Sequence, residues 1–128
     1  MRKAQLAFEF LLLVAVAFLI MIVFSAATRV EFTRADSQKE HALVKDMAFS
    51  LQSEINRVSQ LENGYSRRFR LDLTLDGYPY NATIEQNTLF VRSENYEYPL
   101  PVVPVIGNFT VNATNTIRKT NGVIYLNQ

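Results

Sequence analysis

The chain has 128 residues, 48% of them hydrophobic and 20% charged, which suffices for one small folded domain but not for two independent cores. Thirteen basic and twelve acidic residues give a net charge of +1, which excludes the strongly basic character expected of a nucleic-acid-binding protein. The absence of cysteine excludes disulfide bonds and thiolate chemistry.

Glycine and proline are distributed very unevenly along the chain. All four glycines and all four prolines lie beyond Asn63. Because these residues end helices and form turns, the distribution predicts an α+β fold, with a long N-terminal helix followed by a small antiparallel β domain over residues 64–128.

The helix is expected to begin with an apolar segment over residues 5–27. Residues 6–27 form an apolar run in which Glu9 is the only charge. A bilayer core needs about 20 such residues in helical form, so the run predicts membrane insertion. Arg2 and Lys3 precede it and favour a cytoplasmic N-terminus.

Residues 28–63 are expected to continue the helix in amphipathic form. Asn63 and Gly64 supply a signal for its C-terminal end. So long a helix exposes more apolar surface than the remaining chain can cover, and lipid or other chains must cover the rest. The apolar positions recur at helical spacings of three and four: Val44, Met47, Ala48, Leu51, Ile55 and Val58.

Glu9 is costly in an apolar segment, by about 2.5–3.5 kcal/mol on insertion scales. A cut between Ala4 and Gln5 would create an α-amino group one helical turn from Glu9. Pairing the two charges would neutralise both and align each subunit with its neighbour. Alternatively, Glu9 is simply an acidic residue near a helix start, where the macrodipole favours it by about 0.3–1 kcal/mol.

Residues 2–13, RKAQLAFEFLLL, resemble the class III signal sequence of archaeal type IV pilins. The resemblance implies a prepilin with a leader at residues 1–4, processing at Ala4 and Gln5, and assembly through Gln5 and Glu9. Ala7 departs from the family, which usually has Ser there. Residues 51–55 and 64–69 are similar, more loosely, to a helix end and strand entry of the same pilins, and the leader does not resemble archaellins.

The resemblance also implies function and partners. The expected role is a structural subunit of an extracellular adhesive filament, present in the membrane before assembly. Its partners would be further copies of itself, a prepilin peptidase, an assembly ATPase and a polytopic membrane platform. Nucleic acid is not an expected partner.

Two other interpretations use the same apolar run. Ser25, Ala26 and Ala27 could end a conventional secretory signal, although Glu9 and the length of the run argue against it. The chain could instead be a single-pass membrane protein whose outer β domain binds a ligand or partner.

Alternation of apolar and polar residues predicts strands over residues 66–75, 80–84 and 89–91, forming a meander. A short edge strand is expected at Tyr96 and Tyr98, and residues 99–104 should form an extended covering segment because prolines remove ladder donors. Asn121 and Gly122 predict a hairpin within residues 116–126. One sheet is expected to pack on the helix around Leu51 and Ile55.

Asn81, Asn108 and Asn112 each begin an N-x-Thr tripeptide in the part expected to be outside the cell. Each is a possible N-glycosylation site, or alternatively an unmodified turn or strand asparagine.

The sequence gives no sign of catalysis. His41, the single histidine, lies in a charged helical stretch, and no Cys/His cluster or Gly-rich loop suggests a metal or cofactor. We therefore expect no catalytic residue, no metal and no cofactor. The acidic residues of the β domain are scattered and form no recognisable acid/base pair: Asp72, Asp76, Glu85, Glu94 and Glu97.

Overall fold

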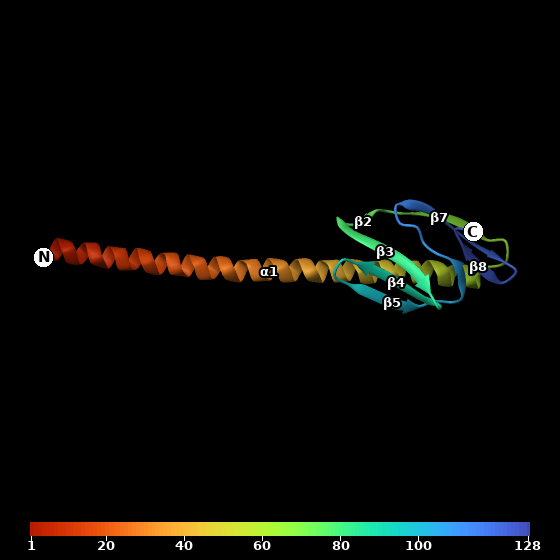
Figure 1. Ribbon diagram of the computed structural model, residues 1–128, viewed down its shortest axis with the longest axis horizontal. Helices are drawn as coiled ribbons and strands as arrows, with labels where there is room; N and C mark the ends of the chain where they lie inside the picture. Colours follow the sequence, from red (N-terminus) through yellow and green to blue (C-terminus); the bar gives the residue numbers. More distant parts are fainter. The chain divides into compact units, whose positions relative to one another are not determined.

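A computed structural model describes residues 1–128 and shows one long helix followed by eight strands (Figure 1). The helix, α1, spans Arg2–Gln60 without interruption, as expected of a segment that contains no glycine or proline. The α+β fold class is therefore confirmed. The chain divides into two compact units, Met1–Gln38 and Lys39–Gln128.

The strands form two four-stranded sheets. The first has the order β1-β7-β8-β6 and the second the order β2-β3-β4-β5. All pairings are antiparallel except β6 with β8, which is parallel. The strands are β1 (Ser66–Leu71), β2 (Thr74–Leu75), β3 (Tyr78–Glu85), β4 (Thr88–Ser93), β5 (Glu97–Pro101), β6 (Val105–Gly107), β7 (Ala113–Thr120) and β8 (Val123–Leu126).

Two expectations about the sheets are wrong. The predicted strand over residues 66–75 is interrupted at Asp72 and Leu73, so that β1 joins the first sheet and β2 the second. The domain consequently has two sheets where one was expected. Leu73 sits at this change of sheet and is 60% exposed, although the alternation placed it inward.

The predicted hairpin and edge strand are confirmed, the latter with different bounds. Asn121 and Gly122 join β7 to β8 with φ of 51° and 79°, the left-handed pair that a two-residue hairpin requires. β5 extends through Pro99 to Pro101, further than expected. It remains at the edge of its sheet, where a missing N–H donor is tolerated.

The hydrophobic core of the second unit forms where both sheets meet the C-terminal part of α1, beside which the strands lie in Figure 1. Leu51, Ile55 and Val58 are at most 2% exposed, as their helical spacing predicts. They pack with strand residues that the two-residue alternation directs inward, including Leu89, Val91, Ile117 and Leu126.

The C-terminal end of α1 is held by the β7–β8 hairpin. The Lys119 ammonium group donates to the carbonyl oxygens of Ser59 (2.7 Å) and Leu61 (2.8 Å). Carbonyl groups at the C-terminal end of a helix have no N–H partner within the helix. The Gly122 N–H donates to Asn63 Oδ1 at 2.8 Å. The helix end is therefore capped by residues from the last hairpin.

Candidate functional site

The most unusual feature of the molecule is the apolar surface of the Met1–Gln38 unit. Nearly every residue of this unit is exposed. The helix is long and apolar enough to cross a membrane, and none of its most apolar stretch is buried within the chain. Between Glu9 and Arg29 the sequence contains no charged residue. The N-terminal segment is therefore compatible with insertion into a bilayer.

The exposed apolar side chains of this segment are large. Fourteen Leu, Ile, Val, Phe and Met side chains between Leu6 and Phe24 are 49–72% exposed. Full burial of one such side chain contributes about 1.5–3 kcal/mol, so covering the whole set is worth on the order of 20 kcal/mol. A surface of this kind, far larger than the apolar patches of monomeric soluble proteins, calls for lipid or protein around it.

Polar groups of the segment are satisfied within the helix or lie near its ends. The Thr28 hydroxyl donates to the Phe24 carbonyl oxygen at 2.8 Å, which removes the cost of placing that hydroxyl in an apolar environment. Arg2 and Lys3 precede the apolar residues, and Arg29 follows them.

Gln5 and Glu9 lie on the same face of the helix, one turn apart. The Gln5 carboxamide Nε2 donates to Glu9 Oε1 at 3.4 Å, a long hydrogen bond, and both side chains are exposed. The Gln5 backbone N–H donates to the Met1 carbonyl oxygen at 3.3 Å. A cut after Ala4 would remove this acceptor and leave a charged amine on the turn that carries Glu9.

The three possible glycosylation asparagines are exposed and differ in their hydrogen bonding. Asn81 Oδ1 accepts from the Ala82 N–H at 2.9 Å, and Asn108 Oδ1 accepts from the Ile84 N–H at 2.6 Å. Asn112 occupies a turn with φ of 58°. All three are accessible from solvent in the folded chain.

His41 contacts aromatic side chains. Its ring lies 5.2 Å from that of Tyr96 and 6.3 Å from that of Tyr98, both edge to face. No group of three or more His, Cys, Asp or Glu side chains is placed to hold a metal ion.

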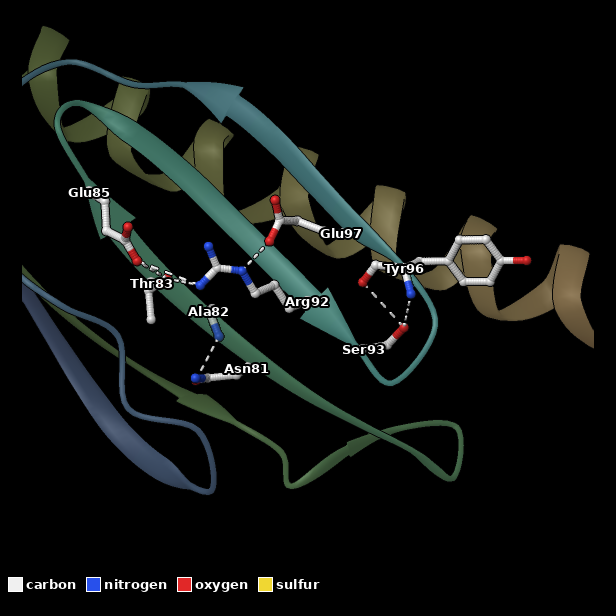
Figure 2. A network of polar contacts seen from close by, with 8 residues as sticks. All are labelled: Asn81, Ala82, Thr83, Glu85, Arg92, Ser93, Tyr96 and Glu97. Atoms are coloured by element: carbon white, nitrogen blue, oxygen red, sulfur yellow. Dashed lines mark hydrogen bonds and ion pairs between the residues drawn. The ribbon is translucent and has the colours of Figure 1, made fainter.

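Figure 2 shows the polar network on the exposed face of β3, β4 and β5. Arg92 is paired with Glu97 and lies 3.5 Å from Glu85, and its guanidinium stacks over the Phe90 ring at 4.8 Å. The hydrogen bond with Glu97, chiefly, raises the pKa of Arg92. One guanidinium therefore pairs with two carboxylates, and it holds this part of β3, β4 and β5 together.

Several structural polar residues could not be identified from the sequence. Glu40 is 5% exposed and accepts a hydrogen bond from Asn95 at 3.0 Å. Asn115 is fully buried and bonds Thr110 and Asn127. The Glu40 contact joins residues 55 apart in sequence, whereas the bonds of Asn115 join residues 5 and 12 apart. Alternation of apolar and polar residues carries no signal for either kind of contact.

Comparisons with protein-family models, curated proteins and solved structures gave no match.

Proposed function

We propose that the chain is a structural subunit of an archaeal type IV pilus-like surface filament that assembles through its N-terminal helix. The observation that carries the proposal is the uncovered apolar surface between Leu6 and Phe24. A bundle of such helices, one from each subunit, would bury that surface. The resemblance of residues 2–13 to archaeal prepilins supports the same conclusion.

Glu9 favours a helical bundle over permanent residence in lipid. In lipid its carboxylate costs about 2.5–3.5 kcal/mol and gains only a long contact with Gln5. After cleavage between Ala4 and Gln5, the new amine of one subunit would neutralise the carboxylate of its own or an adjacent subunit. Glu9 would then align subunits during assembly.

The proposed course of events begins with a membrane precursor whose residues 1–4 lie in the cytoplasm. A prepilin peptidase removes this leader, and an assembly ATPase with its membrane platform transfers the helix from bilayer to filament. The second compact unit, Lys39–Gln128, which we call the β unit, then coats an extracellular filament that serves in adhesion. Neither catalysis nor a bound cofactor is part of this role.

The first experiment is the N-terminal residue and intact mass of the protein isolated from its native host. A start at Gln5 supports prepilin processing. A start at Thr28 would indicate conventional secretion, and an intact Met1 would indicate a permanent anchor; either contradicts the proposal.

The second experiment compares Glu9→Gln with Glu31→Gln in sheared filament fractions. Glu31 is an exposed carboxylate of the same helix, 3.9 Å from Arg34, and lies outside the apolar segment. We expect Glu9→Gln to abolish filaments while the membrane pool persists, and Glu31→Gln to assemble normally.

The same exposed apolar helix also supports a second candidate function, a single-pass membrane protein whose outer β domain binds a ligand or partner. This alternative predicts that Glu9→Gln leaves surface display unchanged and that no filament fraction exists.

A further inference from the structure

Basic residues of the β unit are concentrated in one sheet. The sheet of β1, β7, β8 and β6 contains four arginines and one lysine but no aspartate or glutamate. The strands of the other sheet contain Arg92 with Glu85 and Glu97, which pair with it. The first sheet therefore carries a net positive charge that the second does not share.

Two of these five basic side chains serve the fold. Arg67 forms two hydrogen bonds with the Glu54 carboxylate, at 3.1 and 3.0 Å, and so ties β1 to α1. Lys119 caps the end of the helix. Both belong to the side of the sheet that faces α1.

The other three, Arg68, Arg70 and Arg118, are exposed and form no ion pair within the chain. Because side chains alternate along a strand, they lie on the opposite side from Arg67 and Lys119. Their only described contact is that of the Arg118 guanidinium with the Tyr125 ring, 5.5 Å away. An arginine without a partner is free to bind an anion.

The strand register brings these residues together with threonine hydroxyl groups. Arg68 stands opposite Thr116 and Arg70 opposite Thr114. Arg118 stands opposite Ser66 and is therefore a diagonal neighbour of Arg68, at about 7–8 Å. We call this surface the arginine face: Arg68, Arg70, Arg118, Thr114 and Thr116.

Asp72 is the acidic residue closest in sequence to the arginine face. Its negative charge influences the Tyr80 hydroxyl. The pKa of that hydroxyl is raised mainly by burial and, to a smaller extent, by the charge of Asp72. Asp72 follows the end of β1 and is not part of the register that forms the face.

We propose that the arginine face binds an acidic polysaccharide, a polymer of uronic acid residues. The planar guanidinium group pairs with a carboxylate through two parallel hydrogen bonds, and arginine suits this geometry better than lysine. The intervening threonine hydroxyls can donate to and accept from sugar hydroxyls. An extended sheet surface presents these groups in rows, as a linear polymer requires.

A nucleic acid fits this surface less well. Proteins that bind single strands stack bases on free aromatic rings, whereas one face of the Tyr125 ring is occupied by Arg118. Three arginines also neutralise few phosphates, and the chain as a whole carries a charge of only +1.

This inference rests on the proposed adhesive filament for its biological setting, and it names the class of ligand that such a filament would bind. The binding itself requires no polymerisation. The two proposals can therefore fail separately.

The test uses the full-length chain dispersed in detergent micelles, with polygalacturonate as the probe. We compare Arg68→Gln/Arg118→Gln with Lys45→Gln/Arg57→Gln, which removes the same charge from exposed residues of α1 that form no ion pair. Binding should weaken at least about tenfold in the first variant and less than about twofold in the second, since a tenfold change corresponds to one lost charged contact. Fully methyl-esterified polygalacturonate, which lacks the charge, should not bind.

Equal weakening in both variants, or undiminished binding of the methyl ester, would overturn the proposal. So would tighter binding, through the same two arginines, of single-stranded DNA or of vesicles containing anionic lipid. The Arg68→Gln/Arg118→Gln variant should still form filaments in the host, so loss of polysaccharide binding is distinguishable from loss of assembly.

Discussion

Tyr80 places a hydroxyl in the core without a hydrogen-bond partner. The residue is 8% exposed, and its oxygen is the single buried side-chain polar atom that lacks a partner. Burial, followed by the Asp72 carboxylate, raises the pKa of the hydroxyl above its ordinary 10.0. Desolvating an unpaired hydroxyl costs about 1–3 kcal/mol, so this side chain is not optimised for stability.

We expect Tyr80→Phe to leave the free energy of unfolding unchanged or to raise it by about 1 kcal/mol, because it removes the unpaired group and keeps the ring. Because the pKa of Tyr80 is raised in the folded state, folding favours the neutral hydroxyl. The resulting stability is fully present below the ordinary pKa of 10.0 and is lost as the pH rises through the pKa of the folded state. Denaturant titrations at neutral and alkaline pH should show less alkaline loss in the variant. A destabilisation above about 1 kcal/mol would reveal a partner for the hydroxyl.

The ion pair of Lys39 with Asp76 gives a second residue-scale prediction. The Lys39 ammonium lies 2.5 Å from the Asp76 carboxylate and, by hydrogen bonding and charge, lowers the pKa of Asp76 below its ordinary 3.8. The resulting stabilisation is present above that value and is lost as pH falls through the folded pKa. In Lys39→Gln, NMR titration of the Asp76 carboxyl should show the pKa rising toward 3.8. An unchanged titration would contradict this pairing.

The elements show what local sequence could and could not predict. Helical spacing identified Leu51, Ile55 and Val58 as core residues, and Asn121 with Gly122 identified the last hairpin. The break at Asp72 and Leu73 was missed because apolar and polar residues continue to alternate through it. Only the partner changes there, from β7 for β1 to β3 for β2. The proximity of Gln5 and Glu9 could be predicted, because residues four apart lie on the same face of a helix. The arginine face could not be predicted, because it depends on the pairing of β1 with β7, which local sequence does not encode.

Gly107 tests the parallel pairing of β6 with β8, which the sequence also did not predict. Its φ is 110°, and a Cβ at this position would lie 1.9 Å from the Leu126 carbonyl oxygen. Gly107→Ala should therefore destabilise the unit by roughly 2 kcal/mol or more. Gly77→Ala is the matched control, because Gly77 has φ of 93° with open space around it and should show only the backbone cost of about 1 kcal/mol. Similar values from thermal unfolding of the two variants would argue against the close approach.

At the scale of the whole molecule, the chain combines a β unit with its own core and a helix whose apolar surface is uncovered. The α+β class followed from the position of the glycines and prolines. Membrane compatibility followed from the run of apolar residues.

Leu19→Lys, with Phe32→Lys as control, tests this apolar surface. Both side chains are exposed, at 64% and 73%, but only Leu19 lies within the stretch that has no charge. A lysine at the centre of a membrane segment costs about 2.5–3.5 kcal/mol. Because this cost is small beside the apolar gain, we expect Leu19→Lys to lower the share of the protein in the carbonate-resistant membrane fraction without abolishing it, and Phe32→Lys to leave that share unchanged. Equal retention would show that the helix is not held in lipid at this depth.

The capping of α1 by Lys119 also fixes an order of events during synthesis. The bonded carbonyl of Leu61 and the ammonium of Lys119 are 58 residues apart, and β1 cannot pair until β7 exists. Until the last hairpin is made, the β unit therefore lacks both the neighbour of β1 and the cap of its helix. The apolar helix is made first, so it can reach a bilayer while the β unit is still an open chain.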